Sequence, residues 1–382
     1  MGLKGWIGAT GPSAHAPTIL SRPCARCLPV KVFGTDLGAL ALTLAIGAAG
    51  GSAAALLHLP LGFLIGSLLA TAILAVRDIR PFGKAVTLPL RLRFCFVPVI
   101  GVAIGGAFTP DVWREAAGWG PSLLLLLIFV PLAHAISYGL YRRGGIGRTE
   151  ALFGAVPGGL IETVEMTEEA GGDVRVVTVL QFLRLILTIL SVPLIFLILT
   201  GHAVGSASGV RLAGAAIPLT PRDVGLMVLA GGIGARLAKW LRFPGWIITG
   251  PICASGLLHA AGWLQAIPPG WLIAATQVVL GTGLGARFGG IDPALLRRAG
   301  QLAVINGVVI LTLAFLFALG VGPLVGVPVS AAFLAYAPGG LAEMSLIALS
   351  LNMSTIFVSA HHVARIALSV LVARIAARRV GL

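Results

Sequence analysis

The chain has 382 residues, of which 57% are hydrophobic and only 10% are charged, and its formal net charge is +14. Charged residues make up about 25% of an ordinary soluble domain, so the composition excludes that class. Apolar runs of about 20 residues, long enough to cross a bilayer, recur from Leu37 onward and predict an all-α polytopic membrane protein.

The predicted elements begin after a basic N-terminal segment. Residues 1–36 are rich in Pro and small residues and lack the apolar core of a signal peptide, so we expect a disordered cytoplasmic extension. The clearest apolar runs that follow are Leu37–Leu57, Pro60–Val76, Pro121–Leu140, Val174–Leu199, Leu302–Val321 and Ile356–Val372.

The positive charge lies mostly in short loops beside these runs, where Lys and Arg set orientation toward the cytoplasm. The chain has no basic soluble domain and no recognition motif, so we do not expect it to bind nucleic acid. Its expected partner is the lipid bilayer of the plasma (inner) membrane.

One motif occurs twice. Pro157-Gly158-Gly159-Leu160-Ile161-Glu162 is repeated in the second half of the chain as Pro338-Gly339-Gly340-Leu341-Ala342-Glu343. Arg184 and Arg365 follow the two copies at the same distance, and Pro60 and Gly66 match Pro244 and Gly250 at almost the same spacing along the chain. We therefore predict two homologous repeats, residues 37–200 and 223–382, joined by a linker at 201–222.

The loop charges indicate that the repeats are inverted. Arg77, Arg80, Lys84, Arg91 and Arg93 follow the second run, whereas the matching stretch at 261–277 is uncharged. Conversely, Arg374, Arg378 and Arg379 match neutral positions of the first repeat, although Arg211 and Arg222 of the linker fit less well. Because an inverted repeat needs an odd number of spans, we expect five spans plus one broken or re-entrant Pro-Gly-Gly element per half, with both termini cytoplasmic.

Each half also carries a polar stripe on one face of an apolar helix. Thr178, Gln181, Arg184 and Thr188 match Ser359, His362, Arg365 and Ser369, at spacings of three and four residues. An arginine at mid-membrane costs about 3 kcal/mol unless it has a partner or water, and Glu162 and Glu343 are the nearest opposite charges. Glu–Arg pairs would either lock the helices together or line a substrate path. A third alternative is that the arginines snorkel to an interface.

The Pro-Gly-Gly segments favour a path. They free backbone groups that lipid cannot satisfy, and broken segments at matching positions of two repeats are typical of a transporter site. A simple tight turn is the alternative. Half-helix N-termini near Arg184 and Arg365 would favour an anion such as a carboxylate, while Glu162 and Glu343 would suit proton or sodium coupling. For His362, a proton relay and an ordinary hydrogen-bonded histidine both stay open.

The candidate path residues are Pro157, Gly158, Gly159, Glu162, Thr178, Gln181, Arg184, Pro338, Gly339, Gly340, Glu343, Ser359, His362 and Arg365. The sequence has no P-loop, dinucleotide fingerprint, H-E-x-x-H motif or clustered His/Cys set. We therefore expect no cofactor, no metal and no catalytic residues.

The duplicated Pro-Gly-Gly-Leu-x-Glu, each copy followed by a helix with Gln or His three residues before Arg, resembles the membrane AbrB-duplication family. The resemblance covers nearly the whole chain from about residue 37. Members carry the labels "ammonia monooxygenase" and "transcriptional regulator". The monooxygenase label fits poorly with a sequence that lacks a copper or iron ligand set.

The sequence thus predicts a secondary transporter of a small solute, for which we favour an anion. The alternative is a membrane-embedded regulator that influences gene expression without transport. A homo-oligomer stays open.

Overall fold

The computed structural model describes residues 31–32, 35–108, 112–200, 218–243, 245–351 and 353–381. The predicted extension at 1–36 and linker at 201–222 lie largely outside the described residues, as does Pro244. The described end of the extension forms two antiparallel strands, β1 (Lys31–Val32) and β2 (Thr35–Asp36). The linker is shorter than expected, because the next helix already begins at Pro221.

Apart from that strand pair, the regular elements of the described chain are helices. The first half contains α1 (Leu37–Leu56), α2 (Gly62–Val76), the 3-10 helix η1 (Pro81–Gly83), α3 (Leu90–Gly105), α4 (Val112–Ala117), α5 (Gly120–Arg143), α6 (Arg148–Gly154), α7 (Leu160–Glu169) and α8 (Val174–Thr200). The second half contains α9 (Pro221–Trp240), α10 (Trp246–Ala260), α11 (Gly270–Gly285), the 3-10 helix η2 (Ala286–Phe288), α12 (Pro293–Val325), α13 (Val329–Tyr336), α14 (Leu341–Ser350) and α15 (Thr355–Val380).

Helix bounds in the second half follow those of the first. The bounds of α9 and α10 are those of α1 and α2 shifted along the chain by one constant offset. The bounds of α11 are likewise a shifted copy of those of α3, and the bounds of α14 are a shifted copy of those of α7. An unusual backbone conformation also recurs, since His58 and Arg242, which occupy matching positions after α1 and α9, both have φ 53°. Helix α12 covers in one piece the stretch that the first half divides between α4 and α5.

Five of the described helices are long and apolar enough to cross a membrane: α1, α5, α8, α12 and α15. Helices α2 and α10 have 15 residues, and α3 and α11 have 16. These four are shorter than the roughly 20 residues of a typical span. The membrane class therefore follows from the five long helices, whereas the count of ten spans stays a prediction.

Six helices form one packed unit, which we call the six-helix module: α1, α2, α3, α9, α10 and α11. Helix α11 of the second half packs against α2, and α3 of the first half packs against α10. Glycines permit this close approach, because a Cβ at Gly281 or Gly285 would meet α2, and one at Gly101 or Gly105 would meet α10. Both G-x-x-x-G spacings therefore bring two helices into close contact, as is typical of membrane helices.

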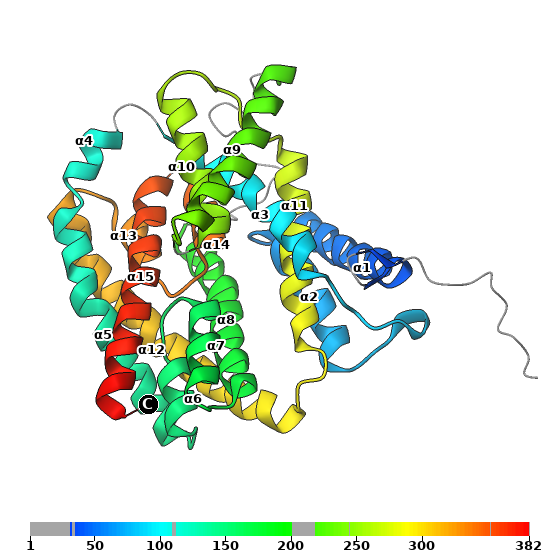
Figure 1. Cartoon of the computed structure of the whole chain (residues 1–382), viewed down its shortest axis with the longest axis vertical. Coiled ribbons are helices and arrows are strands. Elements are labelled where there is room, and N and C mark those ends of the chain that lie inside the picture. The colour runs from blue at the N-terminus through cyan, green and yellow to red at the C-terminus, as the bar shows by residue number, and fades with distance from the viewer. Residues whose placement is uncertain are drawn as a thin grey trace, which may run out of the picture.

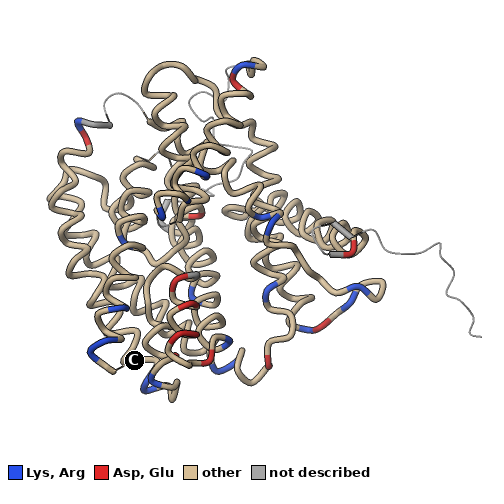
Figure 2. Tube along the Cα trace, in the orientation of Figure 1, with Lys and Arg blue, Asp and Glu red and all other residues tan. Residues whose placement is uncertain are grey.

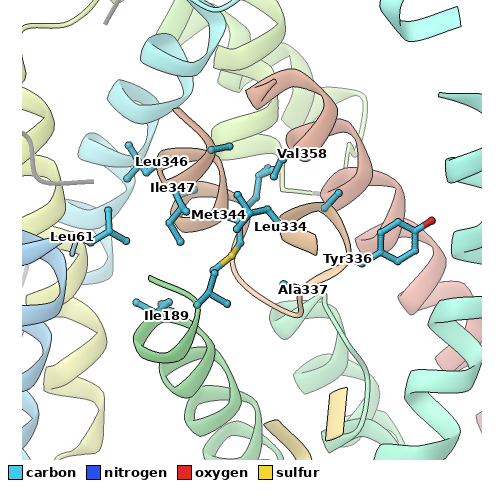
Figure 3. Packing of buried hydrophobic residues seen from close by; sticks show 14 of the residues in the cluster. Leu61, Ile189, Leu334, Tyr336, Ala337, Met344, Leu346, Ile347 and Val358 are labelled. Atoms are coloured by element: carbon cyan, nitrogen blue, oxygen red, sulfur yellow. The ribbon is translucent and has the colours of Figure 1, made fainter. Parts of the chain in front are cut away.

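Helices α5–α8 and α12–α15 form a second unit, the crossing module, beside the first (Figure 1). Its centre is α14, where every residue from Leu341 to Ala348 is buried. Figure 3 shows Met344 of α14 reaching between Ile189 of α8 and Leu334 of α13, all in one hydrophobic cluster. This packing fixes the position of the Pro-Gly-Gly segment just before α14.

Charged residues lie on helices as well as in loops (Figure 2). Glu165, Glu168 and Glu169 are exposed to solvent on helix α7. Arg91 and Arg93, counted as loop residues, lie in the first turn of α3. Arg93 is half-buried rather than free in solvent.

Candidate functional site

Each half contains one helix broken at Pro-Gly-Gly. Helix α6 ends at Gly154 and α7 begins at Leu160, while α13 ends at Tyr336 and α14 begins at Leu341. Proline lacks the N–H that would continue a helix, and the glycines accept the backbone angles of the break. Gly159 has φ 71°, whereas Gly340 has φ −75°, so the two breaks differ in conformation. Both leave carbonyls at the end of one helix and N–H groups at the start of the next without helical partners.

In the first half, Arg184 and Gln181 of α8 satisfy the carbonyls at the end of α6. Gln181 Nε2 donates to the carbonyl oxygens of Phe153 and Val156, at 2.9 and 3.1 Å. Arg184 donates through Nη1 to the same Val156 oxygen and through Nη2 to Gln181 Oε1, at 2.7 Å. The buried guanidinium therefore lies at the negative end of the α6 dipole.

In the second half, Arg365 and His362 of α15 satisfy the carbonyls at the end of α13. Arg365 donates to the carbonyl oxygens of Ala337 and, at 2.8 Å, Gly339. His362 Nε2 lies 2.9 Å from the Leu334 oxygen, and its Nδ1 lies 2.9 Å from Arg365 Nη2. His362 is fully buried. Arg365 is 1% exposed and Arg184 is 7% exposed, so both arginines are interior groups and snorkelling is not observed.

The partners of His362 determine its tautomer. A carbonyl only accepts, so Nε2 carries the proton, and a guanidinium only donates, so Nδ1 must accept. Protonating Nδ1 would break its bond with Arg365 and place two cations in contact. The ring is therefore held neutral as a structural hydrogen-bonding group, and Gln181 makes the same donor and acceptor contacts with its amide.

The expected Glu–Arg pairs do not form. Within the described residues, the ion pairs join Arg80 to Asp78 and Lys84 to Asp36, and neither Glu162 nor Glu343 pairs with an arginine. The reason is that the guanidiniums are used at the C-terminal ends of α6 and α13, while each glutamate lies in the first turn of the following helix. There the positive end of the dipole stabilises the carboxylate.

Both glutamates lie back against their glycines. A Cβ on Gly340 would meet Glu343 Oε2, and one on Gly159 would lie 3.2 Å from Glu162 Oε2. Glu343 is 4% exposed, whereas Glu162 is half-buried. The half-helix N-termini are therefore occupied by side chains of the protein itself, and Arg184 and Arg365 are occupied by carbonyls. This arrangement argues against the anion site that was expected at those four groups.

Each break contacts a helix that belongs to the other half of the chain. A Cβ on Gly158 would lie 3.3 Å from Ile366 of α15, and one on Gly340 would lie 3.4 Å from Leu185 of α8. Each Pro-Gly-Gly segment thus packs against the polar-stripe helix of the other half. Buried atoms without a hydrogen-bond partner among the described residues include Nε of both arginines and Ser369 Oγ.

Other predicted residues lie at the edge of this cluster. Ser359 of α15 shares a 2.8 Å hydrogen bond with Ser345 of α14, and so ties the stripe helix to the broken one. Thr188 bonds to the Arg184 carbonyl of its own helix. Thr178 is half-buried, and no hydrogen bond joins it to the cluster among the described residues. Pro157, Pro338 and Gly339 are buried within the breaks.

A second buried network, Ser122–His361–Tyr336, was not predicted. His361 Nδ1 lies 2.8 Å from the Phe357 carbonyl and its Nε2 lies 2.8 Å from Ser122 Oγ. Tyr336 Oη donates to the Ser122 carbonyl at 2.5 Å. The network joins α5, α13 and α15 and has no equivalent in the first half, where apolar Leu180 matches His361. The adjacent histidines 361 and 362 were the one available signal, but only the second lies on the stripe.

A separate cavity of about 730 Å³ lies between α8, α12 and α13. Its lining is mainly apolar, with Ser191, Thr312 and Ser330 as polar members. It contains none of the predicted site residues.

These features define a helical membrane protein built around two broken helices with buried arginine caps. A family model described as "Transition state regulatory protein AbrB" matches residues 78–381, well over half of the chain. The chain belongs to this family, which confirms the resemblance seen in the sequence.

Two relatives match over most of their length. The "Uncharacterized protein YhjN" of Bacillus subtilis (strain 168) is 27% identical over 342 residues, which are 85% of this chain and 88% of that protein. The "Putative regulator AbrB" of Escherichia coli (strain K12) is 25% identical over 345 residues, or 89% and 93% of the two chains. Neither name states a substrate.

Proposed function

We propose that this protein is a secondary transporter of a small solute, built from two inverted repeats of five spans and one broken element each. The observation that carries the proposal is the pair of broken helices, each of which packs against the stripe helix of the other half. Broken helices at matching positions of two repeats are the form that substrate and ion sites take in secondary transporters.

The depth of the arginines supports this proposal. Arg184 and Arg365 each lie about three turns into their helices, α8 and α15. At about 1.5 Å per residue this is roughly 15 Å, close to half of a hydrocarbon core of about 30 Å. Buried polar groups at that depth are expensive and are typically retained for function.

Chain directions support the inverted relation. In Figure 1, α5 runs toward the end of the molecule where the C-terminus lies, while α12, which matches it, runs away from that end. With the alternating loop charges, this favours ten spans and two re-entrant elements, with both termini in the cytoplasm and the protein in the plasma membrane.

We assign ion coupling to Glu343, and to Glu162 in a lesser role. Glu343 is buried and has no ion-pair partner among the described residues, so a proton or a small cation is the natural species to neutralise its charge during transport. The structural role of His362 leaves the glutamates as the proton-carrying groups. In this proposal the polar clusters hold the broken helices in place, and the protein is not an enzyme.

Uptake of labelled carboxylates into proteoliposomes, measured at several external pH values, tests the proposal. Glu343→Gln should lower uptake at least tenfold and remove its pH dependence, and Glu162→Gln should have a smaller effect. Glu115→Gln, outside the two modules, serves as the control. Unchanged uptake and pH dependence in both glutamate variants would contradict the proposal.

The printed name of the Escherichia coli relative favours one alternative, a membrane-embedded regulator of gene expression. Expression profiling of a deletion strain complemented with wild type or with Arg184→Ala/Arg365→Ala separates the two. A regulator without transport would restore the profile whenever the protein is present in the membrane, and would move no solute.

A further inference from the structure

Two arginines of the six-helix module face the crossing module without a counter-ion. Arg93 in α3 is half-buried, and Arg287, which follows α11 in η2, is more exposed. Neither has a carboxylate within 4.0 Å among the described residues. Neither arginine has a counterpart in the other half, since Ile273 occupies the position that matches Arg93 and Ala107 the position that matches Arg287.

Contacts place these arginines beside the second broken helix. The Arg287 guanidinium carbon lies 4.7 Å from the centre of the Phe182 ring on α8. Leu185, one turn further along the same face of α8, packs against Gly340. Gly340 in turn lies against the carboxylate of Glu343, so contacts along α8 and the second break connect Arg287 to the surroundings of that carboxylate.

Arg93 lies on α3, which packs directly against α14, the helix that carries Glu343. Its charge is near enough to act on both Glu343 and Arg287. The three residues therefore form a group with two positive charges and one negative charge. Arg184 and Arg365 are less suited to the ligand, because carbonyl oxygens and the side chains of Gln181 and His362 already bind their Nη groups.

Such a group is suited to an organic anion. A guanidinium binds a carboxylate through two parallel hydrogen bonds, and the attraction strengthens where water is partly excluded. The two arginines also repel each other, and an anion between them would relieve that repulsion. The Phe182 ring and neighbouring leucines offer an apolar surface for the carbon skeleton of the ligand.

We propose that Arg93 and Arg287 bind the carboxylate of a small organic acid between the two modules, where Glu343 competes with the ligand for Arg93. This proposal rests on the proposed transport function and names the class of its substrate. It also explains how coupling would arise, because neutralising Glu343 frees Arg93 for the anion. The ligand would touch α3 and η2 of one module and α8 and α14 of the other.

Binding of acetate, succinate and benzoate to purified protein in detergent tests this site, with sodium chloride holding the ionic strength constant. Loss of one charged hydrogen-bonding partner should weaken binding about ten- to hundred-fold in Arg93→Gln and in Arg287→Gln. Arg91→Gln, an exposed residue two positions earlier on α3, is the matched control and should bind as wild type. Glu343→Gln should bind more tightly than wild type.

Arg93→Lys and Arg287→Lys keep the charge but lose the two-pronged geometry, so intermediate affinity is expected and would exclude misfolding as the cause. Wild-type affinity in both glutamine variants, or no binding of any of the three acids to wild type, would overturn the site. Binding that depends on both arginines without uptake in proteoliposomes would support the site and contradict transport. Uptake that is insensitive to both arginines would support transport and contradict the site.

Discussion

Replacing His362 offers the sharpest test of the structural role given to the polar stripe. The His362 ring donates to the Leu334 carbonyl and accepts from Arg365, both at 2.9 Å, in a fully buried position. Leucine at this position would leave a carbonyl and a guanidinium N–H without partners. Each buried group left unsatisfied costs about 1–3 kcal/mol, and more when it is charged, so His362→Leu should lower the free energy of unfolding by about 3–5 kcal/mol.

Glutamine should rescue the position, because Gln181 makes the equivalent contacts in the first half. We expect His362→Gln to remain within about 1 kcal/mol of wild type. Reversible unfolding in mixed micelles, followed by the fluorescence of the seven tryptophans, measures both variants. His58→Gln, at an exposed position, is the control. If His362→Gln were as unstable as His362→Leu, or if His362→Leu matched wild type, the assigned contacts would be wrong.

Three further predictions concern packing and the second network. Gly250→Ala should destabilise the protein by about 1–3 kcal/mol, because its Cβ would meet the Gly234 backbone. The control Gly232→Ala should be tolerated, because its Cβ would meet nothing within 4 Å. Thermal unfolding in detergent compares the two variants, and equal losses of stability would refute the close approach. Gly159→Ala should lower protein yield and unfolding temperature because φ is 71° there, while Gly225→Ala should not; an unaffected Gly159→Ala would argue against the left-handed conformation. Ser122→Ala should lower the free energy of unfolding by about 1–3 kcal/mol, because it leaves His361 Nε2 without its partner. The same unfolding titration measures this variant, and an unchanged stability would show that another group binds the ring.

The repeated motif was sufficient to find the two matching sets of polar residues beside the breaks. Equal spacing of Gln181 and Arg184 with His362 and Arg365 placed both sets on matching helices, and the structure buries both sets against the breaks. This result depends on the spacing of residues along one helix, which a sequence displays directly.

The hydrogen-bond partners of the two buried arginines could not be predicted in the same way. Arg184 and Arg365 bind backbone carbonyls at the ends of α6 and α13, and a carbonyl has no sequence signature. Complementary side-chain charges suggested Glu162 and Glu343 instead, although each carboxylate is stabilised at the start of its own helix. Arg93 was misassigned to a loop because its neighbours Arg91 and Lys84 suggested one continuous basic segment, and only the fold shows that α3 carries it against α14.

The central claim, that the protein moves a solute across the membrane, is tested most directly by accumulation in proteoliposomes. Labelled succinate, acetate and benzoate would be presented to vesicles that contain wild-type protein and carry an imposed pH gradient. We expect at least one acid to accumulate further than in protein-free vesicles, dissipation of the gradient to abolish this excess, and Glu343→Gln to prevent it. Equal internal labelling of protein-containing and protein-free vesicles for all three acids would show that the protein does not transport them.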